Sequence, residues 1–67
     1  MLSARNQFKG VVKSVKLGGV MSEVVVTVGN LEFVSAITRS SAEALGLKPG
    51  DEVKAVIKST EVLIDKP

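Results

Sequence analysis

The chain has 67 residues, 45% of them apolar, and its nine basic and seven acidic side chains give a formal net charge of +2. Its length allows one small domain, which we place at residues 1–67, and the absence of cysteine and histidine excludes disulfides and the usual zinc ligands. The same absence removes the commonest catalytic bases and nucleophiles, so we expect a protein that is not an enzyme. We also expect a cytoplasmic protein, because no apolar run approaches the roughly 20 residues that cross a bilayer and no secretory leader is evident.

The apolar residues are too numerous for the interior of so small a domain. A chain of this length buries only about 60% of the surface that its unfolded form exposes. Below about 70–80 residues, natural domains without disulfides or a structural metal usually gain stability by association. We therefore predict that apolar surface is buried between the subunits of a homo-oligomer.

The first half of the sequence predicts three strands. Residues 7–17 combine β-branched residues with interleaved lysines and indicate a long strand, in which Gly10 allows a bend or bulge. The glycine-rich stretch at 18–23 turns the chain. Residues 23–29 and 31–38 are both strand-like, and Gly-Asn between them is a turn signal, so we predict a β-hairpin over residues 23–38.

One short helix is predicted after this hairpin, over residues 40–47. Ser40 or Ser41 can cap its N-terminus, and Gly46 fits the position at which a helix ends. With Ser40 as the cap, Glu43 stands three residues further on, where a capping box requires a carboxylate.

The last part of the chain predicts two more strands, at residues 51–60 and 61–65. In the former, Val53, Ala55 and Ile57 share one face of the strand, and Lys54, Val56 and Lys58 share the other. The order is therefore β-β-β-α-β-β. This order indicates an all-β fold with one short helix, arranged as an OB-like five-stranded Greek-key barrel.

Barrels of this type often bind oligonucleotides, but two features of the sequence argue against that function here. The net charge is too small for binding by phosphate neutralisation. Phe8 and Phe33 are the only aromatic residues, and both lie at strand positions where a role in the core is expected. The carboxylates also lack the spacing of a calcium loop, so we expect no metal-cation site.

Small hydrogen-bond donors gather at the ends of the predicted strands and at the start of the helix, where free N–H groups favour an anion. They are Ser3, Arg5, Thr38, Ser40, Ser41, Lys58, Ser59 and Thr60. Hydroxyls, backbone N–H groups and one or two cations together make a coherent oxyanion site. The alternative is that the serines are only helix caps and that Lys58 is only a surface lysine.

Four stretches of the sequence form a recognisable set: SARNQFKG near the start, AIT at 36–38, LGLKPGDEV at 45–53 and AVIKSTEV at 55–62. Together they resemble the molbindins, which are free-standing molybdate-binding domains of the Mop or TOBE type, and the similarity spans residues 2–65. The resemblance implies an OB-like barrel that assembles into a hexamer, built as a trimer of dimers. It also implies molybdate or tungstate as the bound ligand, held between subunits for intracellular molybdenum storage or homeostasis.

The resemblance also implies which residues bind the oxyanion. Ser3, Ala4 and Arg5 match the SARN motif, and Lys58 and Ser59 add a cation and a hydroxyl from the same side. Thr38 and Ser41 would come from a neighbouring subunit. Molybdenum would be held as the oxyanion, without direct protein ligands to the metal. An oligomeric assembly module without oxyanion binding, or an OB-type nucleic-acid-binding domain, is the alternative.

Overall fold

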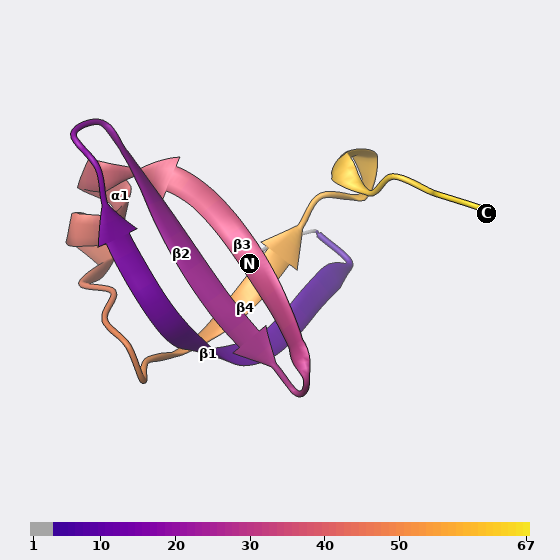
Figure 1. Cartoon of the computed structure of the whole chain (residues 1–67), viewed down its shortest axis with the longest axis horizontal. Helices are drawn as coiled ribbons and strands as arrows, with labels where there is room; N and C mark the ends of the chain where they lie inside the picture. The colour runs from indigo at the N-terminus through magenta and orange to yellow at the C-terminus, as the bar shows by residue number, and fades with distance from the viewer. Residues whose placement is uncertain (1–3) are drawn as a thin grey trace.

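The computed structural model describes residues 4–67, which form a strongly curved antiparallel sheet with one helix against it (Figure 1). The strands are β1 (Asn6–Leu17), β2 (Met21–Val28), β3 (Leu31–Thr38) and β4 (Glu52–Ile57); the helices are α1 (Arg39–Leu45) and the 3₁₀ turn η1 (Ser59–Glu61). The strands lie in the order β3-β2-β1-β4, and all neighbouring pairs are antiparallel. A mostly β fold with one short helix is thus confirmed.

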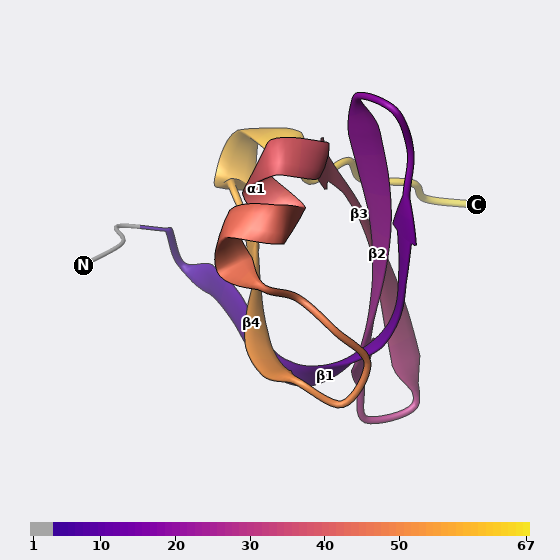
Figure 2. The ribbon, with the colours of Figure 1, turned by 90° about the vertical axis from the view of Figure 1, so that its left-hand side faces the viewer.

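The long strand β1 is shared between two partners. Its first half pairs with β4, from Asn6 opposite Ile57 to Val11 opposite Glu52, and its second half pairs with β2. The register with β2 shifts between Val12 and Ser14, so the bulge lies after Val12 rather than at Gly10. Figure 2 shows how β1 curves between the β2–β3 side and the β4 side, which gives the sheet the shape of an incomplete barrel.

Gly10 is required because β1 passes very close to β2 at this point. A Cβ atom built on Gly10 would lie 2.5 Å from the backbone oxygen of Thr27 and 2.8 Å from a methyl group of Val26. No side chain fits at such distances unless the backbone moves. Glycine at this interior position of β1 therefore permits the close approach of the β1 and β2 backbones.

The predicted β-hairpin is confirmed, with β2 and β3 paired from Met21 opposite Thr38 to Val28 opposite Leu31. Gly29 adopts φ of 60°, which a tight turn between two strands requires and glycine adopts without strain. The hairpin supplies Val24 and Val26 to the cluster of three buried valines, and β1 supplies the third, Val12; Ala42 of α1 is also buried. In β4 the predicted alternation is also confirmed, since Val53, Ala55 and Ile57 are half-buried and their neighbours are exposed.

The cap predicted for the helix is wrong by two or three residues. Thr38, the last residue of β3, is the N-cap: its backbone is extended and its hydroxyl accepts a hydrogen bond from the N–H of Ser41. The strand runs directly into the helix, so the cap falls at the junction, and Glu43 pairs with Arg39 instead of closing a capping box. Gly46 ends the helix in the left-handed conformation, with φ of 62°, as predicted.

The predicted fifth strand at residues 61–65 is wrong for this chain. Beyond β4 the chain forms η1, and residues 62–67 have no regular structure and lead away from the body of the molecule (Figures 1 and 2). A strand of this length is stable only when it is paired. The segment has no strand beside it, so the described residues form a four-stranded barrel that is open between β3 and β4.

The two phenylalanines span the open side of this barrel. Phe8 belongs to β1 and Phe33 to β3, which are not neighbours in the sheet, yet their rings stack with centroids 5.3 Å apart. Phe33 is half-buried and Phe8 is 38% exposed. The expected core role is wrong for Phe8, which is exposed, and Phe33 reaches only the half-buried class, because the barrel is open where the two rings meet.

Candidate oxyanion site

The first group of predicted site residues gathers where the β1–β4 ladder ends. Asn6 opposite Ile57 is its last pair, so Arg5, which precedes Asn6, and Lys58, which follows Ile57, lie at the same end of the ladder. Both are exposed. Ser3 lies outside the described residues. The antiparallel pairing therefore brings two cations together from opposite ends of the sequence.

Local hydrogen bonds fix the backbone on both sides of this group. The side-chain amide of Gln7 donates to the carbonyl oxygen of Ala4, which holds the turn before β1. After β4, the N–H of Glu61 donates to the carbonyl oxygen of Lys58 at 2.9 Å and forms η1, whose first residue is Ser59. Ala4 is half-buried and Ser59 is exposed. These turns leave the Arg5 and Ser59 side chains at the surface.

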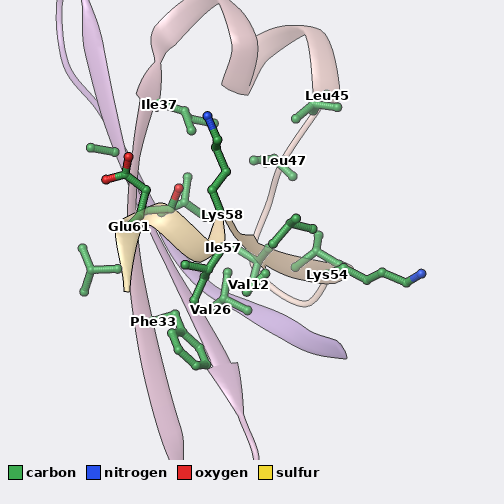
Figure 3. A pocket seen from close by; sticks show the side chains of 17 residues that line it. Val12, Val26, Phe33, Ile37, Leu45, Leu47, Lys54, Ile57, Lys58 and Glu61 are labelled. Carbon is green, nitrogen blue, oxygen red and sulfur yellow. The ribbon is translucent and has the colours of Figure 1, made fainter. Parts of the chain in front are cut away.

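The two cations of this group are free to bind a ligand. Among residues 4–67, neither Arg5 nor Lys58 forms an ion pair. Figure 3 shows the Lys58 side chain beside Ile57, extending toward the side on which Ile37 lies. Glu61 is close to Lys58 in sequence and lines the same groove. The predicted oxyanion-binding residues include no carboxylate, but Glu61 places one beside them.

The second group of predicted site residues lies at the junction of β3 and α1. The Thr38 hydroxyl accepts from the N–H of Ser41 at 3.1 Å and donates to the Ser41 hydroxyl at 2.7 Å. The Thr38 proton is thereby used within the chain, while the proton of the exposed Ser41 hydroxyl remains available to a ligand. Ser40 lies beside the pair, with its oxygen 3.4 Å from that of Thr38.

Arg39 is a cation of this second group that the sequence reasoning missed. Its guanidinium donates to the carbonyl oxygen of Gly18 at 3.3 Å and lies 3.6 Å from a carboxylate oxygen of Glu43. The i,i+4 spacing of Arg39 and Glu43 was the available signal. Because these contacts are internal, Arg39 fixes the helix against the β1–β2 turn.

One chain does not bring the two groups together. In Figure 1, α1 lies at one side of the molecule, and the end of β4 lies at the other. The open groove between β3 and β4 separates them, and this groove has a volume of about 700 Å³ with a mainly apolar lining. The first group and the second group thus present their hydrogen-bond donors on different sides of the chain.

Other kinds of site find little support in the part of the chain that the structure describes. Over residues 4–67, no three histidine, cysteine, aspartate or glutamate residues gather as metal ligands. In the same residues, no helix is long and apolar enough to cross a membrane. The pKa of the Asp51 carboxyl is lowered by hydrogen bonds from the side chain and backbone of Lys48, but this pair lies in the loop between α1 and β4.

Residues 2–64 match the TOBE domain family. The chain belongs to the TOBE domain family. Over 64 residues this TOBE domain is 52% identical to molybdenum-pterin-binding protein 3 of Clostridium pasteurianum, and the match covers 94% of each chain. The resemblance noted from the sequence is therefore confirmed at the level of the family.

Two solved structures agree with this assignment. The TOBE domain superposes on a molybdate-binding protein from Sporomusa ovata with a TM-score of 0.94, at 39% identity and with 98% of each chain covered. It also matches the cytoplasmic molybdate-binding protein ModG, in a form with molybdate bound, with a TM-score of 0.82 and 42% identity; the match covers 88% of this chain and 43% of that one. These neighbours share the fold over nearly all of the TOBE domain.

Proposed function

We propose that this TOBE domain binds molybdate, and tungstate as its chemical analogue, between the chains of a homo-oligomer. The observation that carries the proposal is the division of the donors between two sides of one chain, with Arg5, Lys58 and Ser59 on one and Thr38 and Ser41 on the other. A second chain supplies the missing half of each site. The likeness to ModG with molybdate bound supports this choice of ligand.

The chemistry of the donors suits a fully deprotonated oxyanion. Molybdate is a tetrahedral dianion at neutral pH and needs donors only. Arg5 and Lys58 supply charge, the hydroxyls supply direction, and Ser3 and Ala4 extend the first group. Phosphate retains a proton at this pH and needs an acceptor, so a set of residues without Asp or Glu disfavours it. Molybdenum enters as the oxyanion and is not coordinated by protein atoms.

A hexamer built as a trimer of dimers is the assembly that we propose. Large apolar side chains on several elements are exposed in the single chain, among them Val20 at 77%, Val34 at 67% and Leu45 at 69%. So many large exposed apolar side chains on one small chain favour association. Such an assembly, acting as a cytoplasmic store or buffer of molybdate, is consistent with the description of ModG as cytoplasmic.

Nucleic-acid binding is a weaker candidate than oxyanion binding. Single-stranded binding relies on exposed aromatic rings on which bases stack. Phe8 and Phe33 stack on each other instead, with centroids 5.3 Å apart. A pure assembly module, with no ligand, is the remaining alternative.

Native mass spectrometry of the purified protein, with molybdate and with sulfate as control, tests the proposal. We expect an oligomer that gains discrete molybdate adducts and no sulfate adducts. An oligomer that gains neither anion would leave only the assembly module. A monomer that shows no adduct at any concentration would contradict sites between chains.

The contribution of individual donors can be separated by titration calorimetry with molybdate. We expect Arg5→Ala to lose about 1.5–3 kcal/mol of binding free energy, because hydrogen bonds to charged groups are the stronger ones. The loss for Ser59→Ala should be about 0.5–1.5 kcal/mol, as for a neutral hydrogen bond. Equal losses would mean that Arg5 lies at the periphery of the site.

A further inference from the structure

The positive charge of the chain is concentrated on one part of the sheet. Nine basic and seven acidic residues give the net charge of +2. Four of the bases and only one of the acids lie on the β1–β4 ladder or at its end: Arg5, Lys9, Lys54, Lys58 and Glu52. The remaining five bases are outnumbered by six acids, so the ladder carries +3 and the rest of the chain −1. The whole positive excess therefore lies on this ladder.

The middle of the ladder holds a pair of lysines. Lys9 of β1 lies directly opposite Lys54 of β4, and both are exposed. Among residues 4–67 neither of them forms an ion pair, whereas Lys13, further along β1, pairs with Glu32. Like charges at directly opposite positions destabilise a sheet. The Lys9–Lys54 pair is thus an uncompensated double charge that costs folding stability.

The surface around this lysine pair is open to solvent. An open hollow of about 510 Å³ is lined by Lys9, Gly10, Val11, Glu52, Val53 and Lys54. Figure 3 shows the Lys54 side chain extending away from Glu61. Glu52 lies opposite Val11, on the side of the lysine pair that is away from Arg5. The potential along the ladder therefore becomes more positive from Glu52 toward Arg5.

The lysine pair lies on the same ladder as the first group of predicted oxyanion-binding residues. Arg5 and Lys58 are each four residues from a member of the pair, which is about 13 Å along the strands at roughly 3.3 Å per residue. An anion held by Arg5 and Lys58 is too far away for contact with the pair. It is within the range of its charge in dilute salt, because the Debye length is about 30 Å at 0.01 M.

We propose that Lys9 and Lys54 steer a dianionic ligand toward the site at Arg5 and Lys58 and so raise its association rate constant, kon. This role rests on the proposed function, because molybdate is the ligand that arrives. A surface of one charge sign raises the local concentration of an oppositely charged ligand, and its association becomes faster. The dissociation rate constant, koff, is set by the direct contacts at Arg5, Lys58 and the hydroxyls.

The size of the effect follows from charge and distance. For a dianion about 13 Å from two positive charges, the dielectric constant of water and the Debye length of 0.01 M salt give about a fourfold increase in kon. In 1 M salt the Debye length is about 3 Å, and the increase vanishes. Ionic strength thus separates steering from direct contact.

The double variant Lys9→Gln/Lys54→Gln tests this role, with Lys13→Gln/Lys16→Gln as the matched control. Each variant lowers the net charge from +2 to zero. The control changes two exposed lysines of β1 that lie in the half of the strand paired with β2, farther from Arg5. Removal of a like-charge pair does not weaken the sheet, so the test variant should fold, and circular dichroism checks both proteins.

Both rate constants can be obtained for the full chain with molybdate as the probe. Titration calorimetry gives Kd, the NMR line shapes of the Lys58 and Ser59 amide signals give koff, and the two together give kon. At 0.01 M ionic strength we expect kon of Lys9→Gln/Lys54→Gln to fall about fourfold with koff unchanged, and kon of the control to fall less than about twofold. In 1 M salt both variants should equal the wild type.

The other outcomes separate the steering role from the proposed function. Equal losses in the two variants would assign the effect to net charge alone and overturn the proposal. A loss that appears in koff, or that persists in 1 M salt, would also overturn it, because the lysines would then contact the bound anion. A wild-type protein that does not bind molybdate in any of these conditions would overturn the proposed function, and the steering role with it.

Discussion

The two sides of the barrel differ in how complete they are within one chain. On the side of β1, β2 and β3, the ladders are continuous and Val12, Val24 and Val26 are buried. On the side between β3 and β4, the two backbone edges are unpaired and Ile57 faces a groove. The first side is specified by contacts between strands that lie close in sequence. The second side stays open within one chain, because residues 62–67 lead away from it.

This difference separates two sources of stability. A buried side chain on the complete side stabilises every folded chain, whether or not it has a partner. An exposed apolar side chain at the open groove stabilises only the associated form, because its surface is removed from water only there. Substitutions on the two sides should therefore differ in how their effects depend on protein concentration.

The largest expected effect sharpens this comparison through a pair of valines. Val12→Ala removes two buried methyl groups and should lower the free energy of unfolding by about 2–3 kcal/mol, at any protein concentration. Val34→Ala, at the exposed edge of the groove, should change it by less than about 0.5 kcal/mol in dilute solution. Urea unfolding at several concentrations measures both. If Val34→Ala lowered the free energy of unfolding in dilute solution as much as Val12→Ala does, the distinction between the two sides would be contradicted.

The second prediction concerns the close approach of β1 and β2 on the complete side. Gly10→Ala places a methyl group 2.5 Å from the Thr27 backbone oxygen, and the strands must separate to admit it. We expect a loss of about 1–3 kcal/mol of unfolding free energy. Gly19→Ala is the matched control, since nothing lies within 4 Å of its Cβ position. A Gly10→Ala variant as stable as this control would show that the contact relaxes without cost.

The parts of the fold that could be predicted are those whose signals are local. The hairpin over residues 23–38, the end of the helix at Gly46 and the alternation of β4 all follow from residues close together in the chain. The fifth strand at 61–65 carries the same kind of signal, yet it is not formed. A strand pattern shows that a segment can pair, whereas pairing itself depends on an edge that sequence alone does not locate.

The candidate site shows the same limit. The donor residues could be chosen by type, and antiparallel pairing of β1 with β4 does bring Arg5 to the same end as Lys58. The cap at Thr38 was missed because β3 runs into α1 without a loop, and a threonine that ends a strand gives no separate signal for a helix start. In the proposed assembly, a second chain would have to bring Ser41 to Arg5. All of the binding residues therefore remain a prediction.

Removing the N-terminal cap of α1 should have a smaller effect on the free energy of unfolding. Thr38→Ala removes the acceptor for the Ser41 N–H and should lower the free energy of unfolding by about 1 kcal/mol. Ser40→Ala, at the second residue of the helix, should change it by a few tenths of a kcal/mol, because the Ser40 hydroxyl is not the cap. The thermal midpoint of each variant measures the difference. A larger loss for Ser40→Ala would mean that the cap predicted from the sequence is the real one in solution.

The smallest expected effect concerns the loop between α1 and β4, which contains Lys48 and Asp51. Asp51 accepts hydrogen bonds from the backbone and side chain of Lys48, at 3.0 and 2.9 Å, and these hold its pKa below the ordinary 3.8. Because the folded pKa is the lower one, the stabilisation is present above the unfolded value and is lost as the pH falls through the folded value.

Asp51→Asn removes this titration. We expect the wild-type protein to be slightly more stable than the variant at neutral pH, and the difference to vanish in acid, well below pH 3.8. Urea midpoints measured from neutral to acidic pH follow the difference. Since the Lys48 side chain is 74% exposed and water screens the pair, the difference should be smaller than the losses expected for Val12→Ala, Gly10→Ala and Thr38→Ala. A difference that persists unchanged in acid would assign it to the shape of the asparagine in the loop rather than to the charge of Asp51.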